Sequence, residues 1–371
     1  MRETLEREVK LVPPPDFVLP ELGGQRLPTR TFISTYHDTP QLVLARHSIT
    51  FRHRIEDGAG LWQLKIPHGA ARIELEAGGP PARPPEELLR LLPAFLRGRE
   101  VVPIARLRTR RESVRTAGVE VVDDAVAVLD GQHVTRRFRE LEMELLDGDE
   151  DALRRVEKEL RLAGAEPREL RPKVFEALDY SGALEPVALP KGATPAEELA
   201  AALSEQVRRL LRHDPGTRLG SDPEDLHQLR VATRRLRAFL RAGRPLLEEA
   251  WAEGLRAELG WLGGELGPTR DLDVMLERLR DEAASLGDDG AAAAPLLAQV
   301  EAERETARAA ALEALSGDRY LALLERLDGV GEPPLSGDDV ALAHIWRSEL
   351  KRTAKAFARL GDETPDDELH A

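Results

Sequence analysis

The chain has 371 residues, of which 42% are hydrophobic and 32% are charged, and its formal net charge is −14. That length predicts two or three domains, and the negative charge argues against a general binder of nucleic acid or of anionic membranes. The absence of cysteine excludes disulfides and thiolate metal sites and is consistent with a reducing cytoplasm, where we expect the protein to reside. There is no apolar signal region at the N-terminus, and no stretch approaches the roughly 20 apolar residues of a membrane span.

The composition changes once along the chain. Residues 1–183 alternate as strands do, residues 184–195 are a linker rich in Gly, Ala and Pro, and residues 196–371 have helical periodicity. The predicted fold class is therefore α+β, with a strand-rich domain followed by an all-α domain.

The opening strand places Glu6, Glu8 and Lys10 two residues apart, so these three side chains share one face. On its own, charged alternation is common on solvated strands. It recurs, however, along the first half of the chain. In order, the further charged faces carry Arg52 and Arg54; Lys65; Arg72, Glu74 and Glu76; Arg106, Arg108 and Arg110; and Glu140, Glu142 and Glu144.

For the segments between these strands, the residue types predict the secondary structure. Residues 31–36 form a β-branched and aromatic strand, followed by a turn at 37–40 and a short helix over 41–46. Connecting helices are predicted over 85–96 and 151–162, and residues 119–129 form one or two Val-rich strands. Lys173 falls in a final strand or at the start of a helix.

The charged faces carry mostly Arg and Glu, whereas a solvated sheet face favours Thr, Ser, Gln and Lys. A closed barrel with a charged lumen explains this composition, and it would hold a ligand that combines phosphate with a metal. Guanidinium and ammonium groups neutralise phosphate oxygens, and clustered carboxylates bind Mg²⁺ or Mn²⁺. This chemistry suits phosphoryl transfer. The chain has no P-loop sequence to provide an alternative phosphate site.

Several motifs in order resemble the CYTH family, the triphosphate tunnel metalloenzymes. They are E-x-E-x-K at residues 6–10, Tyr-His-Asp-Thr-Pro at 36–40, Arg-x-Arg at 52–54, Leu-Lys-Ile-Pro at 64–67 and Glu-Leu-Glu-Met-Glu at 140–144. The family includes inorganic triphosphatases, thiamine triphosphatases and class IV adenylate cyclases. The resemblance covers residues 1–183 and implies an eight-stranded antiparallel β-barrel tunnel with flanking helices.

The same resemblance implies roles for individual residues. Lys10 would bind phosphate or position the attacking water, and the metal, Mg²⁺ or Mn²⁺, would be held by carboxylates that include the catalytic pair Glu6 and Glu8. The implied metal ligands are Glu6, Glu8, Glu142 and Glu144. The implied triphosphate-binding residues are Arg52, Arg54, Lys65, Arg108, Arg110 and Lys173. The implied activity is hydrolysis of inorganic triphosphate or a related triphosphate; the alternatives are an adenylate cyclase and a non-enzymatic scaffold that binds polyphosphate.

In the helical half, residues 226–247 carry one histidine and six arginines without an acid. His227, Arg230, Arg234, Arg237 and Arg241 are three or four residues apart, so they line one helix face. A second basic helix is predicted over 344–359. Basic faces of this kind bind polyanions, and an aromatic content of only 4% disfavours nucleic acid, which needs stacking partners.

The segments 226–237 and 266–274 resemble the CHAD domain, a helical family associated with polyphosphate binding and often fused behind CYTH. It implies two four-helix repeats around a basic pore, with phosphate contacts from His227, Arg230, Arg234, Arg237, Arg241 and Arg270. Residues 367–371 repeat the pattern of residues 224–228, which opens the first basic helix. We therefore expect an incomplete second repeat and a reduced affinity for polyphosphate.

Overall fold

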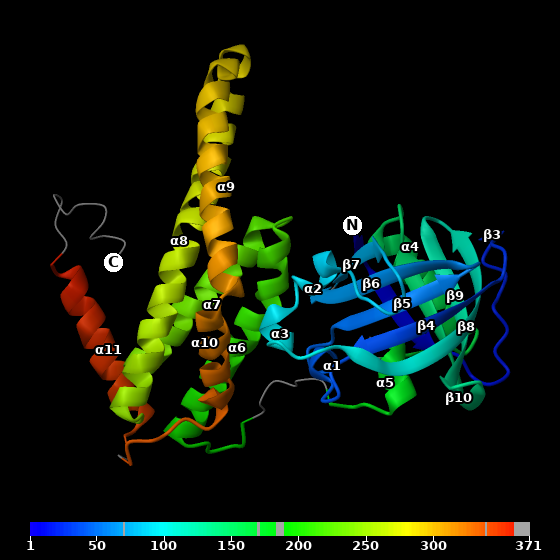
Figure 1. Ribbon diagram of the computed structural model, residues 1–371, viewed down its shortest axis with the longest axis horizontal. Coiled ribbons are helices and arrows are strands. Elements are labelled where there is room, and N and C mark those ends of the chain that lie inside the picture. The colour runs from blue at the N-terminus through cyan, green and yellow to red at the C-terminus, as the bar shows by residue number, and fades with distance from the viewer. Residues whose placement is uncertain (70, 169–170, 183–188, 338–339, 360–371) are drawn as a thin grey trace. The chain divides into compact units, whose positions relative to one another are not determined.

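The computed structural model describes residues 1–69, 71–168, 171–182, 189–337 and 340–359. The chain divides into two compact units, Met1–Glu185 and Pro186–Ala371. The first is an antiparallel sheet with short helices and the second is helical, which confirms the predicted α+β class (Figure 1). Part of the predicted linker 184–195 and the repeated pattern at 367–371 lie outside the described residues.

The sheet of the first unit has eleven strands. They are β1 (Arg2–Glu6), β2 (Glu8–Val12), β3 (Gln25–Arg26), β4 (Arg30–Asp38), β5 (Thr50–Glu56), β6 (Ala59–His68), β7 (Ala71–Gly78), β8 (Val102–Thr116), β9 (Val119–Asp130), β10 (His133–Leu145) and β11 (Glu166–Pro167). The strands predicted from alternation are all present, and the Val-rich segment forms the single strand β9.

The hydrogen-bonded order is β1-β7-β6-β5-β4-β8-β9-β10-β2-β11, with β3 beside β8. The predicted eight-stranded closed barrel is therefore wrong, because there are eleven strands and the ladder does not return to its start. Arg7 divides the opening segment, which was predicted as one strand, into two strands. β1 pairs with β7, whereas β2 pairs with β10. The covalent link at Arg7 thus joins two distant regions of the same sheet.

Apolar side chains on one face of β10 pack against helix α4 (Glu150–Leu162). Leu141 and Met143 belong to the same buried cluster as Leu153, Val156 and Leu160 of the helix. Successive strand residues point to opposite faces, so this packing turns Glu140, Glu142 and Glu144 to the other side of the sheet. The amphipathic helix predicted over 151–162 is confirmed.

Short helices follow several strands: α1 (Val43–Arg46), α2 (Glu86–Leu89), α3 (Pro93–Leu96) and α5 (Lys173–Leu178). The turn before α1 is organised by the buried Asp38, whose carboxylate accepts hydrogen bonds from the backbone amides of Thr39, Leu44 and Ala45. The single helix predicted over 85–96 is instead two helices of one turn each, the second of which begins at Pro93.

The second unit is built from α6 (Pro195–Leu219), α7 (Pro223–Ala242), α8 (Glu249–Ser285), α9 (Ala294–Ser316), α10 (Asp318–Asp328) and α11 (Leu342–Phe357), with 3₁₀ turns η1 (Gly287–Ala293) and η2 (Gly329–Gly331). Thr194 and Glu197 form a reciprocal capping box that begins α6. Leu210, Leu236 and Leu259 are fully buried and come from α6, α7 and α8 in turn, as the helical periodicity predicts.

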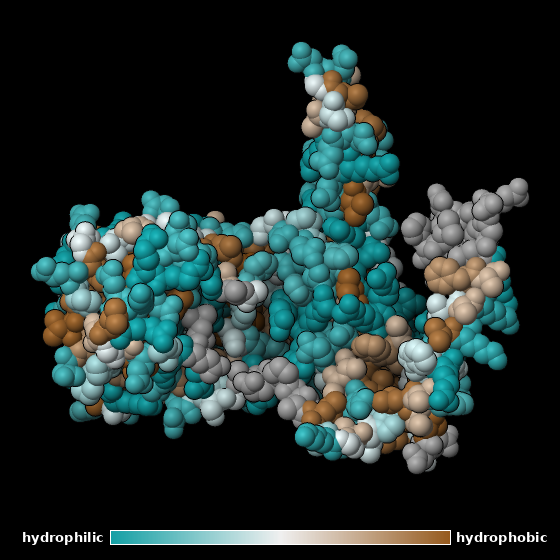
Figure 2. Space-filling model, turned by 180° about the vertical axis from the view of Figure 1, so that it is seen from behind, coloured by the Kyte–Doolittle hydropathy of each residue, from teal (hydrophilic) through white to brown (hydrophobic). Residues whose placement is uncertain are grey.

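The distal halves of α8 and α9 form an antiparallel hairpin joined by η1 (Figure 1). Figure 2 shows mainly hydrophilic residues on the projecting part of this hairpin. α11 buries none of its side chains, and Trp346 and Phe357 are exposed. Among the helices of the described ranges, none combines the length with the apolar character that crossing a membrane requires.

Candidate active site

The inner, charged face of the sheet surrounds a cavity of about 190 Å³. Its walls come from strands that are distant in the sequence. The lining residues are Glu6, Glu8, Lys10, Tyr36, Thr50, Arg52, Arg54, Gln63, Lys65, Arg72, Glu74, Glu76, Arg111, Glu142, Glu144, Pro172 and Lys173. The structure therefore brings to one cavity all the site residues predicted for the first domain except Arg108 and Arg110.

Three carboxylates form a compact group in this cavity. Glu144 lies directly opposite Glu8 on the neighbouring strand, and Glu142 follows two residues earlier on the same face. One oxygen from each of Glu8, Glu142 and Glu144 lies within 4.8 Å of the other two. Oxygen donors from three carboxylates are the ligand set that Mg²⁺ or Mn²⁺ prefers, so these residues fit such an ion.

Two buried lysines hold Glu142 in place. The ammonium of Lys10 lies 2.5 Å from Glu142 and 3.3 Å from Glu140. Lys173, at the start of α5, lies 2.7 Å from Glu142, 2.6 Å from Glu140 and 3.1 Å from Asp124. Burial alone would raise the pKa of Glu142, but Lys10 and Lys173 hold that pKa well below its usual range. Glu142 is therefore ionised and oriented before any ligand binds.

The pKa of Glu144 is shifted the other way. Burial raises it, and the neighbouring charge of Glu142 raises it further. Glu144 makes no ion pair or hydrogen bond with any described residue. A half-buried carboxylate that has no cationic partner and is repelled by its neighbour gains free energy from a bound cation, as a metal ligand does.

The opposite wall of the cavity is cationic. The guanidinium of Arg52 donates to Gln63 at 2.8 Å and to the hydroxyl of Tyr36 at 3.1 Å. Arg54 pairs with Glu56, and its guanidinium carbon lies 3.8 Å from the centre of the Phe32 ring. Both arginines project from β5 into the cavity, as the alternation predicted. Guanidinium groups are suited to binding phosphate oxygens.

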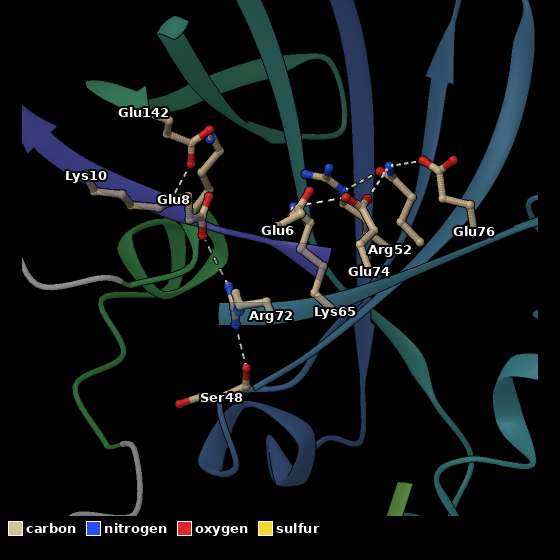
Figure 3. Close-up of polar contacts among 12 residues, drawn as sticks. Glu6, Glu8, Lys10, Ser48, Arg52, Lys65, Arg72, Glu74, Glu76 and Glu142 are labelled. Carbon is tan, nitrogen blue, oxygen red and sulfur yellow. Dashed lines mark hydrogen bonds and ion pairs between the residues drawn. The ribbon is translucent and has the colours of Figure 1, made fainter. Parts of the chain in front are cut away.

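Lys65 joins a second acidic pair within the cavity (Figure 3). Its ammonium lies 2.5 Å from Glu6 and 3.4 Å from Glu74. Burial and the hydrogen bond to Glu74 raise the pKa of Glu6 to about 8. Burial opposes ionisation of Glu74 as well, but Lys65 outweighs it and lowers that pKa to about 2. Glu6 therefore lies in the cavity, but the structure does not place it in the three-carboxylate group.

Arg108 and Arg110 are absent from the cavity, which contradicts their predicted role in binding triphosphate. On β8 the inward positions are Leu107, Thr109 and Arg111, so Arg108 and Arg110 point to the outer face and are exposed. Arg111 takes their place: it makes two hydrogen bonds to Asp124, at 2.9 and 2.7 Å, and lies 3.4 Å from Glu142.

Other residues of the site were missed in the same way. Arg72 donates to the backbone oxygen of Ser48 at 2.6 Å and lies 4.0 Å from Glu8, as Figure 3 shows. Gln63 donates to both Glu74 and Glu76. Arg72, Glu74 and Glu76 were predicted to share a polar face, and that signal could have added them to the site. Gln63 precedes Lys65 by two residues, so the same alternation predicted that it shares the face of Lys65, but its neutral side chain gave no reason to assign it to the site.

The arginines predicted for polyphosphate binding in the second unit lie along α7 and α8. Arg230 donates to the backbone oxygen of Gly267 at 2.6 Å and lies 3.3 Å from Asp271. Arg234, Arg237 and Arg241 are exposed on α7, and His227 is half-buried. Arg241 lies 3.7 Å from Glu349 of α11. The structure thus brings these α7 side chains to one stretch of helix surface.

Arg270 belongs to α8 and lines a separate hollow of about 630 Å³ together with Arg280 and Arg304. Five acidic residues also line this hollow, so its charge is mixed. They are Asp273, Glu277, Asp281, Glu301 and Glu305.

Comparison with known proteins identifies both halves. The CYTH domain model matches residues 4–170, and the CHAD domain model matches residues 201–371. The uncharacterized protein MT2285 of Mycobacterium tuberculosis is 32% identical over 381 residues, which cover 92% of this chain and 72% of that protein. The chain therefore belongs to the proteins that join a CYTH domain to a CHAD domain. CYTH domains form the triphosphate tunnel family of triphosphatases and adenylate cyclases and depend on Mg²⁺ or Mn²⁺, and CHAD domains bind polyphosphate.

Two solved structures are similar to parts of the chain. PptA from Streptomyces chartreusis is 29% identical with a TM-score of 0.40, and the match covers 46% of this chain and 62% of that one. HpAC1 from Hippeastrum is 19% identical with a TM-score of 0.33 and coverages of 49% and 98%. The CHAD match extends through residue 371, so it gives no clear sign of the incomplete repeat that we expected.

Proposed function

We propose that the protein is a metal-dependent triphosphatase that hydrolyses inorganic triphosphate or a related triphosphate, and that its helical unit binds polyphosphate. The observation that carries this proposal is the arrangement of charge in one cavity. A group of three carboxylates, Glu8, Glu142 and Glu144, shares that cavity with a wall of cationic side chains. The first set suits a hard metal ion and the second suits phosphate oxygens.

The cavity lining favours a bare triphosphate over a nucleotide. Among the residues that line it, only Tyr36 is aromatic, and its hydroxyl accepts a hydrogen bond from Arg52. Pro172 is the only aliphatic side chain in the same set. A purine base needs an apolar or aromatic contact, whereas a chain of phosphates needs only charge and hydrogen bonds. This composition supports the triphosphatase over the adenylate cyclase alternative.

The protein side chains have separate tasks in the proposed reaction. Arg52, Arg54 and Arg111 bind the phosphate oxygens and stabilise the charge that spreads over them in the transition state. Glu8, Glu142 and Glu144 hold the metal, which supplies Lewis-acid stabilisation of the same charge when it is bound. Lys10 keeps Glu142 ionised and oriented, and we assign it a positioning role beside the attacking water.

A substrate panel tests this proposal. We expect the purified chain with Mg²⁺ or Mn²⁺ to release orthophosphate from tripolyphosphate, and to form little cyclic nucleotide from ATP. Removal of the divalent metal by a chelator should stop the release. If cyclic AMP is the main product from ATP and tripolyphosphate is untouched, the cyclase alternative is correct. If neither substrate reacts while polyphosphate is retained, the protein is a scaffold. We also retain the cytoplasm as its proposed location.

A further inference from the structure

Arg106, Arg108 and Arg110, which the active site does not use, form a row on the outer face of β8. Directly opposite residues on neighbouring strands share a face, so the strand register defines what surrounds this row. The outward rows across β4, β8, β9 and β10 are Thr35, Arg106 and Leu129; Ile33, Arg108, Ala127 and Arg137; and Thr31, Arg110, Ala125 and Arg139. None of these positions holds an acidic residue.

Most of these guanidiniums have no partner in the described part of the chain. Arg106, Arg108 and Arg137 are exposed and make no ion pair or hydrogen bond with any described residue. Arg110 pairs with Glu112 at 2.7 Å, but the two side chains are 60% and 40% exposed, so that pair is weak. Arg139 is different, because Asp123 neutralises it at 2.5 Å. We call Arg106, Arg108, Arg110 and Arg137 the outer arginine patch.

The spacing within the patch makes its charges repel one another. Residues two apart on a strand are separated by about 6.8 Å, and residues two strands apart by about 10 Å. Both separations are comparable to the screening length of about 8 Å at physiological ionic strength. Although the chain has a net charge of −14 and 67 acidic residues, the three rows contain none, and the nearest acids on this face are Glu112 and Asp123 in the row beyond Arg110. A polyanion would remove this repulsion.

The neighbouring side chains indicate which kind of polyanion fits. The positions between the arginines are occupied by Thr, Ala, Ile and Leu, and none of these rows contains an aromatic residue. Single-stranded nucleic acid binds to surfaces that combine basic groups with aromatic stacking platforms. A linear polyanion without bases needs only the cations, and the extended strand presents them in a line.

We propose that the outer arginine patch is a second binding surface for long-chain inorganic polyphosphate, separate from the cavity and from the α7 face. The patch lies on the opposite side of the sheet from Arg111, so a chain bound there does not occupy the cavity. The choice of polyphosphate rests in part on the proposed function, whereas the existence of an anion-binding surface rests on the patch itself.

The test compares two triple variants of the full chain that change its net charge equally. The patch variant is R106Q, R108Q and R137Q; the control variant is R83Q, R90Q and R99Q, three exposed arginines of the same unit. Both are also made with R230Q, R234Q and R237Q, so that the α7 face does not mask the result. Equilibrium binding of labelled long-chain polyphosphate is measured at several salt concentrations, and thermal unfolding verifies the fold of each variant.

We expect the patch variant to bind about tenfold more weakly and to lower the slope of log affinity against log salt by about two, since each lost phosphate contact removes about 0.7. The control variant should change affinity by less than twofold. Equal effects of the two triples, or no effect of either, would overturn the proposal. Equally tight, patch-dependent binding of oligothymidylate or polyglutamate would overturn the choice of polyphosphate. The readout is binding, so a chain that fails to hydrolyse tripolyphosphate refutes the enzyme without deciding this question.

Discussion

Replacing Glu144 with glutamine is expected to lower metal-dependent hydrolysis of tripolyphosphate by about a thousandfold, because several kcal/mol of stabilisation by the bound metal are lost with one of its ligands. The fold should not suffer. Glu144 is half-buried and its pKa is raised by desolvation and by Glu142, so the ionised carboxylate is unfavourable in the folded state without metal. Removing that charge relieves a repulsion. We therefore expect the free energy of unfolding of the metal-free E144Q variant to equal or exceed that of the wild type.

The matched change at Glu142 separates a metal ligand from a structural anion. Glu142 also neutralises Lys10, Lys173 and Arg111, so E142Q should lose both turnover and stability. Manganese binding, urea unfolding and phosphate release measured on both variants distinguish these effects. Retention of polyphosphate should be unchanged in either variant if the helical unit binds it. Full turnover in E144Q would mean that the three-carboxylate group is not the metal site.

The second large effect is expected at Arg111. The R111Q variant should reduce kcat/KM for tripolyphosphate by about 100- to 1,000-fold, as the loss of one donor to a transition-state oxyanion does elsewhere. R108Q should remain within about twofold of the wild type for this small substrate, because Arg108 projects from the other face of β8. The phosphate-release assay is run on both variants at saturating metal.

The R111Q variant also removes one of the two cations that neutralise the buried carboxylate of Asp124. Lys173 remains 3.1 Å away and should preserve the fold. An R111K variant that restores part of the activity would show that charge in the cavity matters. If R108Q is the damaging change and R111Q is neutral, the register of β8 given by the structure is wrong, and the cavity described above does not form.

The sequence predicted the strands well because their alternation reflects burial on one side only. Phe51, Trp62 and Leu141 are almost fully buried on one side of their strands. Charged residues that alternate with them, such as Arg52, Lys65 and Glu142, face the cavity. The phase of β8 was harder to predict. Arginines occur there at positions 106, 108, 110 and 111, so composition alone did not reveal which set points inward. Only the packing of Leu107 with α5 and Tyr36 fixes that choice.

The division of the opening segment between two strands could not be predicted either. E-x-E-x-K was interpreted as a single strand, and within that strand Glu6 and Glu8 would be equivalent neighbours. The structure divides them between β1 and β2, which belong to different parts of the ladder. As a result Glu8 joins Glu142 and Glu144, whereas Glu6 joins Lys65 and Glu74. Which strand pairs with each half of the opening segment depends on long-range strand pairing. The spacing of residues along the sequence does not predict that pairing.

In the helical unit, the periodicity was sufficient to place the arginines on one side of α7. It did not predict the contacts that hold them. Arg230 is held by backbone oxygens of α8, whereas the exposed Arg241 only lies near Glu349 of α11, at 3.7 Å. The sequence likewise gave no sign that Arg270 would line a hollow whose walls carry more acids than bases.

Diffraction from crystals of the full chain soaked with Mn²⁺ and tripolyphosphate tests the central claim most directly, because anomalous scattering locates the metal independently of any assignment. We predict a manganese peak among the carboxylates of Glu8, Glu142 and Glu144, with phosphate density that contacts Arg52, Arg54 and Arg111. Manganese found only elsewhere, with an empty cavity between these carboxylates and arginines, would contradict the account.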